Sequence, residues 1–145
     1  MDWTGTINDI NRFSTIPNVV SGLKVKPNTC NEEISTVDLS RFDFVKKVDI
    51  GSNSLQHAQQ LTMNGLNKLT EMTIGEGSFN QSKTINIGSN SLNSMTEFNL
   101  QTFQSLNEVS IGEKSMNAVG SVNASGLTGL TQFIVNQNSL EETTE

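Results

Sequence analysis

The sequence predicts a mainly β protein that winds as a right-handed solenoid of about five coils, each of ~24 residues with two short strands, and that contains little helix. Three observations lead to this fold class. Pairs of apolar residues separated by one residue recur along the chain, which is typical of strands with one buried face. Every second pair follows the last at a nearly constant interval. Hydrophobic residues are 34% and aromatic residues 6% of the chain, which is low for a single globular core.

The apolar pairs place ten strands on two faces of the coil. On one face the interval between consecutive pairs is constant, and on the other it varies only slightly around the same value. The stretch IGSNSL occurs twice, separated by one and a half coils, so we expect Ile50 and Ile87 on opposite faces. The pairs begin at Leu23, Val48, Met72, Phe98 and Val122 on one face and at Val37, Leu61, Ile85, Val109 and Phe133 on the other.

Two kinds of unit connect the strands. The long unit follows the strand with Gly, two variable residues, Ser or Thr, and a large apolar residue. The short unit has apolar residues at its sixth and ninth positions, which fits a turn or a 3₁₀ segment. We expect the glycines of the long unit to adopt positive φ, because Gly reaches that region at low cost. These glycines are Gly51, Gly75, Gly88 and Gly112.

The long unit continues with positions that each have an expected role. Its sixth residue is often Asn, and we expect these side chains to stack as a buried ladder that satisfies loop backbone groups. Its seventh residue is a small Ser or Thr that suits an inner corner, and its eighth is large, apolar and expected in the core. The expected ladder residues are Asn28, Asn53, Asn90 and Asn138.

We expect three segments along the chain. Residues 1–22 are an N-terminal cap or partial repeat, in which Trp3 and Phe13 cover the first coil. Residues 23–140 form the solenoid. Residues 141–145 are an acidic polar tail whose charge discourages the stacking of a further coil.

Charge and hydropathy exclude two classes of partner. The net charge is −6, and residues 48–145 hold three basic residues against nine acidic ones. Phosphate binding requires a basic stripe, so nucleic acid is not the expected partner. No apolar run approaches the roughly 20 residues that cross a bilayer, so we expect no membrane insertion. The first residues lack the basic and apolar regions of a signal peptide, which leaves the compartment open.

The joined units carry a family resemblance. The stretch FDFVKKVDIGSNSL fits the pattern LxxLxLxxNxL through Val45, Val48, Ile50, Asn53 and Leu55. Repeated in register, this pattern resembles the leucine-rich repeat, and the IGxxSF and IGxxSL ends are most similar to BspA-like (Treponema-type) repeats. The resemblance covers roughly residues 13–140. It implies a solenoid used for protein or cell-surface contacts, an extracellular setting and no catalytic residues.

The sequence departs from the family pattern at three positions. Gly77 and Lys114 replace the ladder Asn in two coils. Ser82 stands where an apolar residue should precede Ile85.

No set of residues indicates catalysis, a cofactor or a metal. His57 is the single histidine and lies in a polar stretch without a Cys, Ser or acidic partner at a useful spacing. Cys30 takes a position that elsewhere holds Leu, Phe or Met, so we expect a buried thiol. A single cysteine also excludes an intrachain disulfide. Two sequons, at Asn80 and Asn123, leave N-glycosylation open.

Surfaces therefore remain as candidate sites. Each strand has one outward side chain between its two buried ones, and strands stacked about 4.8 Å apart align these side chains in a polar row on each face. The candidate partner-binding residues are Lys24, Asp49, Thr73, Asn99 and Asn123 on one face and Asp38, Thr62, Asn86 and Ser110 on the other. Ile134 takes the next outward position of the second row.

Two functions are consistent with this pattern. The first is a non-catalytic leucine-rich-repeat binding module that recognises a protein or a glycan, with cell-surface adhesion as one setting. The alternative is a structural or self-associating scaffold segment of a longer repeat array. It is suggested by the lack of obvious end caps, since an uncapped coil exposes apolar core and unpaired strand edges.

Overall fold

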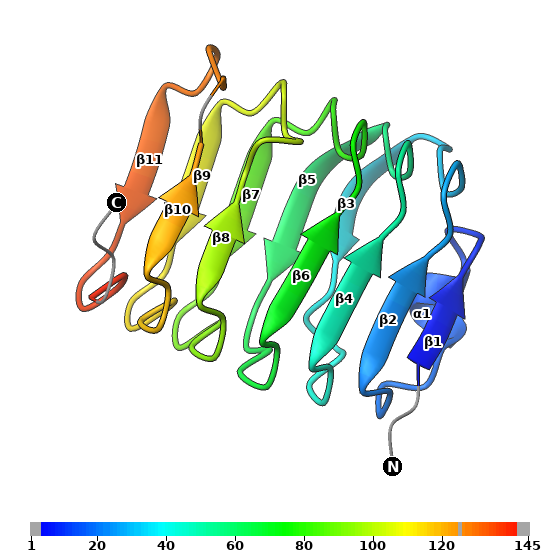
Figure 1. The fold of residues 1–145 in the computed structure, drawn as a ribbon, viewed down its shortest axis with the longest axis horizontal. Helices are drawn as coiled ribbons and strands as arrows, with labels where there is room; N and C mark the ends of the chain where they lie inside the picture. The colour runs from blue at the N-terminus through cyan, green and yellow to red at the C-terminus, as the bar shows by residue number, and fades with distance from the viewer. Residues whose placement is uncertain (1–3, 125, 142–145) are drawn as a thin grey trace.

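The chain forms a β-solenoid of about five coils, each of ~24 residues, as the sequence predicts (Figure 1). The computed structural model describes residues 4–124 and 126–141. Each coil contributes one strand to each of two faces, and paired strands within a face run parallel. Helix is limited in the described residues to the single turn α1 (Arg12–Thr15).

The front face contains the even-numbered strands, nearest the viewer in Figure 1, together with β1. Its register follows the predicted apolar pairs, with Leu23 opposite Val48 and Val48 opposite Met72. The strands are β1 (Thr4–Ile7), β2 (Gly22–Val25), β4 (Lys47–Ile50), β6 (Glu71–Ile74), β8 (Glu97–Asn99) and β10 (Ser121–Asn123).

The back face contains the odd-numbered strands from β3 onward and is one continuous five-stranded sheet. Phe133 lies opposite Val109 and Val109 opposite Ile85, so each strand pairs with the one a full coil away, as predicted. Ile87 belongs to this face, whereas Ile50 belongs to the front face, so the two copies of IGSNSL lie on opposite faces as predicted. The strands are β3 (Ile34–Asp38), β5 (Ala58–Met63), β7 (Thr84–Ile87), β9 (Glu108–Ile111) and β11 (Gln132–Val135).

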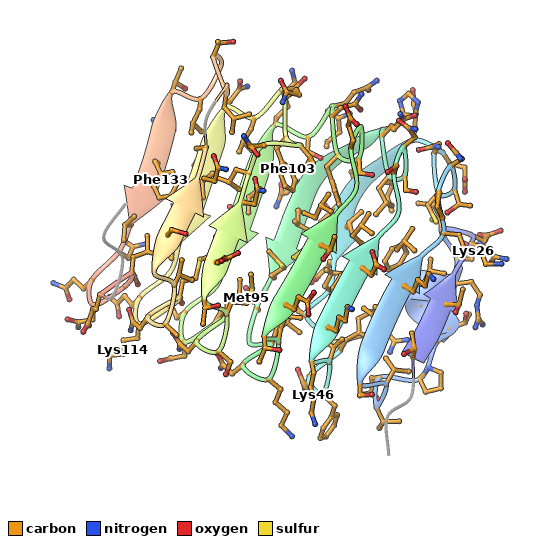
Figure 2. All side chains as sticks on the ribbon, viewed as in Figure 1. Lys26, Lys46, Met95, Phe103, Lys114 and Phe133 are labelled. Carbon is orange, nitrogen blue, oxygen red and sulfur yellow. The ribbon has the colours of Figure 1, made fainter. Side chains whose placement is uncertain are left out.

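The core lies between the two faces and at the corners that join them. Inward strand residues such as Val48 and Ile85 are fully buried. At the corner that follows the front strands, the Phe79 and Phe103 rings stack with centroids 5.2 Å apart, and both side chains are fully buried. Phe103 is labelled in Figure 2. This apolar interior holds the faces together, because the strands of one face make no ladder hydrogen bonds with those of the other in the described part of the chain.

The N-terminal end of the solenoid is covered. Strand β1 pairs with β2, and Ile16, which follows α1, is buried. Phe13 is half-buried against the core, as expected, while Trp3 lies outside the described residues. The Arg41 guanidinium donates hydrogen bonds to the carbonyls of Phe13 and Ile16, which fastens this cap to the next coil.

The glycines of the long unit do not have positive φ, so that prediction is wrong. They are required for close approach between coils instead: a Cβ on Gly51 would lie 2.5 Å from Pro27 N, and one on Gly112 would lie 2.6 Å from Gly88 C. Positive φ occurs two and four residues further on, at the sixth and eighth positions. The sixth-position residues are Asn28, Asn53, Gly77, Asn90, Lys114 and Asn138, and the eighth-position residues are Cys30, Leu55, Phe79, Leu92, Met116 and Leu140.

The sixth-position asparagines are exposed, so the predicted buried ladder is also wrong at that position. Asn is favoured there because it tolerates the left-handed conformation. Ser82, where the repeat pattern predicted an apolar residue, is fully buried and donates through Oγ to Ala58 O at 2.6 Å. A hydrogen bond thus replaces the apolar contact expected at that position.

The long and short units exchange corners midway along the solenoid. Long units form the front-to-back corner in the first three coils, ending with residues 75–83, and short units form it afterwards, beginning with residues 100–107. The back-to-front corner has the opposite order, with short units first and long units from residues 88–96 onward. The exchange therefore falls between β6 and β8.

Candidate functional site

The structure aligns the predicted polar rows. On the front face Lys24, Asp49 and Thr73 lie in register on adjacent strands, and Asn99 lies opposite Asn123. On the back face the aligned residues are Asp38, Thr62, Asn86 and Ser110, followed by Ile134. The front row is not continuous, because no register joins Thr73 to Asn99.

Two of the predicted row residues have local structural roles. Asn99 Oδ1 accepts a hydrogen bond from Gln101 N at 2.9 Å, and Asp38 Oδ1 accepts one from Ser40 N at 2.9 Å. Both are Asx turns that start the short corner units. These side chains are therefore partly committed to the fold.

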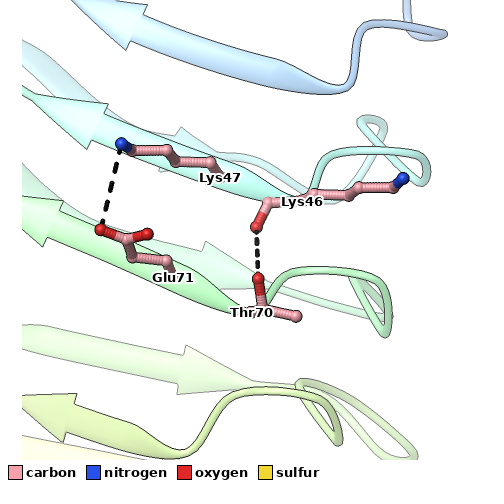
Figure 3. A network of polar contacts seen from close by, with 4 residues as sticks. All are labelled: Lys46, Lys47, Thr70 and Glu71. Carbon is pink, nitrogen blue, oxygen red and sulfur yellow. Dashed lines mark hydrogen bonds and ion pairs between the residues drawn. The ribbon is translucent and has the colours of Figure 1, made fainter. Parts of the chain in front are cut away.

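The front face carries one ion pair within the described residues, between Lys47 Nζ and Glu71 Oε1 at 4.0 Å (Figure 3). Both side chains are largely exposed, so water and salt screen the pair and it adds little stability. Next to it, Lys46 O accepts hydrogen bonds from Thr70 N at 2.9 Å and Thr70 Oγ1 at 3.2 Å. These contacts close the rung between β4 and β6.

The next rung of the front face, between β6 and β8, is not formed. Strand β6 pairs with β4 and β8 pairs with β10, but the two do not pair with each other. Almost all Cα–Cα distances between β6 and β8 exceed 8 Å, whereas paired strands are about 4.8 Å apart. The wider spacing is visible in Figure 1. At this point the front face has two facing strand edges whose backbone groups lack ladder partners among the described strands.

The interruption exposes residues that are buried elsewhere on this face. Val48 and Ile50 of β4 are at most 2% exposed. Their counterparts in β6, Met72 and Ile74, are only half-buried although they point toward the core. The floor of the gap is therefore apolar.

An asparagine amide at the ninth position of the long unit clamps the next coil. Asn31 Nδ2 donates to Asn53 O at 2.9 Å, and Asn31 Oδ1 accepts from Gln56 N at 3.0 Å. Asn93 makes the same pair of bonds with Lys114 O and Asn117 N, both at 2.9 Å. This is the asparagine ladder of the protein, three positions beyond the one that the sequence predicted.

At the corner after β6 the equivalent asparagine forms no such hydrogen bonds with the described residues. Asn80 occupies the ninth position there, but the following coil has a short unit at this corner, and Asn80 Oδ1 is buried without a hydrogen-bond partner among the described residues. The backbone N–H of Gly77, whose counterparts Asn28 and Asn53 donate to the next coil, also makes no hydrogen bond with the described residues. At the opposite corner the same two coils are joined by hydrogen bonds, because Asn67 Nδ2 donates to Asn90 O and Asn67 Oδ1 accepts from Asn93 N.

A second unpaired group faces the gap from the other side. Thr102 Oγ1, in the short unit after β8, is buried without a hydrogen-bond partner among the described residues. Buried polar atoms without partners are rare and destabilising in native proteins. Both such side-chain atoms in the described residues border the same gap.

The gap contains a groove of about 670 Å³ that continues into a second hollow of about 230 Å³. Ile74, Asn99 and Thr102 line both. The charged side chains that line the two hollows are Glu76 and Glu97, and no basic residue lines either one in the described part of the chain. We call this site the β6–β8 groove.

The groove connects with the sequence predictions in part. Two predicted row residues, Thr73 and Asn99, lie on its two sides. Asn80, Thr102 and Gly77 were missed as site residues. The signal in the sequence was the longest interval of the front face, from Met72 to Phe98, together with two consecutive long units, which mark the place where the corners exchange.

The remaining reactive residues occupy structural positions. His57 is half-buried, with Nδ1 3.2 Å from Gln81 Oε1. Cys30 is buried, as predicted, and desolvation raises the pKa of its thiol, with an opposing contribution from a hydrogen bond to Thr29. The described residues contain no group of three or more His, Cys, Asp or Glu side chains placed to hold a metal ion. They also contain no helix long and apolar enough to cross a membrane.

The fold and the groove define a β-solenoid with polar strand faces, one of which is interrupted. No protein-family model, no curated protein and no solved structure matches this chain.

Proposed function

We propose that this protein is a non-catalytic binding module that recognises a protein partner, or a glycan, on its front face. The observation that carries the proposal is the β6–β8 groove. In a solenoid whose other coils bond to their neighbours, it concentrates unpaired strand edges, the Asn80 and Thr102 oxygens that lack partners among the described residues, and a half-buried apolar floor. Polar groups of this kind destabilise a protein when they lack hydrogen bonds. A partner that forms hydrogen bonds with them therefore gains binding free energy.

The resemblance to BspA-like leucine-rich repeats supports the same proposal. Solenoids of that kind bind along their stacked strands. Cell-surface adhesion is the setting we propose on this ground.

The front and back faces provide a matched test. The protein is screened against a library of extracellular domains and a glycan array, and its binding is compared with that of Thr73→Arg on the front face and Thr62→Arg on the back face. Both residues lie at the outward position of their strands, and Thr73 lines the groove. We expect Thr73→Arg to abolish the binding and Thr62→Arg to preserve it. Equal loss from both variants, or from Thr62→Arg alone, contradicts a front-face site.

A second candidate function, end-to-end self-association, is favoured by the C-terminal coil. Phe133, Ile134 and Val135 of β11 are 39% to 42% exposed, and β11 pairs only with β9 among the described strands. Figure 2 shows Phe133 at this end of the solenoid. Light scattering over a concentration series tests this function. An apparent mass that rises with concentration, and that Ile134→Lys returns to the monomer value, supports self-association. A monomer at all concentrations contradicts it.

A further inference from the structure

We propose that the β6–β8 groove binds an extended peptide segment of the partner protein, inserted as a strand between β6 and β8 and carrying a basic side chain. This inference rests on the proposed front-face recognition and names the partner chemistry.

The gap between β6 and β8 is wider than the spacing of two paired strands. Two strands that flank a third one in a sheet are about 9.6 Å apart, twice the ordinary spacing. The distances between β6 and β8 exceed 8 Å for almost every Cα pair, and the facing edges of both strands are unpaired among the described strands. An added strand would form ladders with both edges at once, which is the hydrogen-bond pattern of peptide recognition by strand addition.

Polar groups without hydrogen-bond partners among the described residues lie beside the gap. In the first coil, Asn28 N and the Asn31 amide bond only to main-chain atoms of the following coil. Gly77 N and the Asn80 amide are the same groups in the third coil, and they have no such partner within the described residues. Gly77 N and the Asn80 amide are therefore equivalent to groups that bond to a main chain elsewhere in the solenoid, and Thr102 Oγ1 borders the gap from the other side.

The floor of the gap is apolar and half-buried. A strand in the gap would direct alternate side chains toward Met72 and Ile74, whose exposed surface would then be covered. A β-branched residue such as Val fits this role. A flat carbohydrate would leave the Met72 and Ile74 side chains uncovered and the strand edges unpaired.

The groove is lined by acidic side chains. Glu76 and Glu97 line the groove without a basic residue among the described lining side chains, whereas Glu71, at the start of β6, already has Lys47 as a partner. A Lys or Arg on the outward side of the inserted strand would face these two carboxylates. The free edge of a second copy is a poorer occupant, because β11 has the sequence QFIV and offers no basic residue.

The test uses NMR titration of the ¹⁵N-labelled full chain with the acetylated, amidated peptide Lys-Val-Thr-Val-Lys. We expect shifts confined to amides of β6, β8 and residues 75–80, and no such shifts with the peptide Glu-Val-Thr-Val-Glu or with a backbone N-methylated form of the Lys peptide. No shift at millimolar Lys peptide overturns the inference. Equal binding of the acidic peptide overturns the charge assignment, and equal binding of the methylated peptide overturns strand insertion.

Two variants separate recognition from folding. Asn80→Leu and Thr102→Val each remove an unpaired oxygen, and Asn86→Leu and Thr36→Val make the same changes on the back face. We expect each groove variant to weaken peptide binding about tenfold, the effect of one or two hydrogen bonds, and the back-face variants to leave it unchanged. The melting temperature of the groove variants should not fall, because neither oxygen has a hydrogen-bond partner among the described residues. Unchanged peptide affinity, or a loss of affinity that follows a lower melting temperature, overturns the assignment.

The outcomes also distinguish this inference from the proposed function. If Thr73→Arg abolishes binding to a library partner while the Lys peptide does not bind, front-face recognition stands and strand insertion fails. If the Lys peptide shifts back-face amides instead, both fail.

Discussion

Ser78 Oγ accepts a hydrogen bond from the backbone N–H of Ser54 at 3.1 Å, one coil earlier. The same hydroxyl donates to Gly51 O at 2.7 Å, so one buried Ser satisfies both a donor and an acceptor of the preceding corner. Ser115 repeats the arrangement by accepting from Ser91 N at 3.0 Å and donating to Gly88 O at 2.6 Å. Ladder hydrogen bonds join the strands, and these hydroxyls join the corners between them.

The serine ladder gives the first prediction. Ser115→Ala should lower the free energy of unfolding by about 1–3 kcal/mol, because it leaves the buried Ser91 N–H and the half-buried Gly88 carbonyl without these partners. Ser89→Ala, at an exposed position on the same corner, should change it by less than about 0.5 kcal/mol. Urea unfolding followed by circular dichroism measures both. Equal effects of the two substitutions would show that the ladder contributes no stability.

The second prediction compares two glycines of the long unit. A Cβ on Gly112 would lie 2.6 Å from backbone atoms of Gly88 and Ser89, which cannot move without separating the coils. A Cβ on Gly88 would instead meet the exposed Asn64 side chain at 2.1 Å, and this side chain can rotate away. Gly112→Ala should therefore cost about 1–3 kcal/mol and Gly88→Ala clearly less. The order of the two unfolding midpoints in urea checks this, and the reverse order would contradict it.

The third prediction uses one substitution at two equivalent positions. Asn93→Ala removes an amide that bonds to Lys114 O and Asn117 N and should cost about 1–3 kcal/mol. Asn80→Ala removes an amide whose Oδ1 has no partner in the described residues and should change stability by less than about 0.5 kcal/mol. Thermal unfolding of the two variants at equal concentration measures the difference. A cost at Asn80 as large as at Asn93 would mean that the third coil clamps its neighbour after all.

The strand positions were predictable because apolar residues such as Val48 and Ile85 recur with two periods. One period is the alternation within a strand, and the other is the length of a coil. The backbone of the turns was less predictable. Gly51 was assigned positive φ on residue preference, but absence of a Cβ serves close approach as well as left-handed backbone, and the sequence does not distinguish the two uses. Leu55 has φ of 53°, which no propensity favours, because burial of its side chain decides the conformation.

The groove could be predicted only in outline. Thr73 and Asn99 were found because alternation exposes them. Asn80 and Thr102 were not found, because what distinguishes each side chain is a hydrogen-bond partner that the neighbouring coil does not supply. The partners are missing because a long corner unit stacks on a short one at this junction. Which units stack on each other depends on the three-dimensional fold, and the spacing of residues in the sequence indicates it only weakly.

The fourth prediction concerns pH and Cys30. Burial raises the pKa of this thiol in the folded state, while the thiol of the unfolded chain titrates near its ordinary value of about 8.5. The folded state therefore binds the proton more tightly. The contribution of the protonated thiol to the free energy of unfolding is fully present below about pH 8.5, and it is lost as the pH rises through the folded-state pKa. Between neutral pH and about pH 10, the urea midpoint should fall more for the wild type than for Cys30→Ala.

Below neutral pH the two curves should run parallel, which serves as the control, since the thiol is then protonated in both the folded and the unfolded state. The same burial predicts that a thiol-specific disulfide reagent reacts slowly with native protein and rapidly in urea, because only the exposed thiolate is nucleophilic. Parallel curves at alkaline pH, or a native thiol that reacts as fast as the unfolded one, would mean that Cys30 is accessible. The first turn of the solenoid would then have to open without unfolding of the coils that follow it.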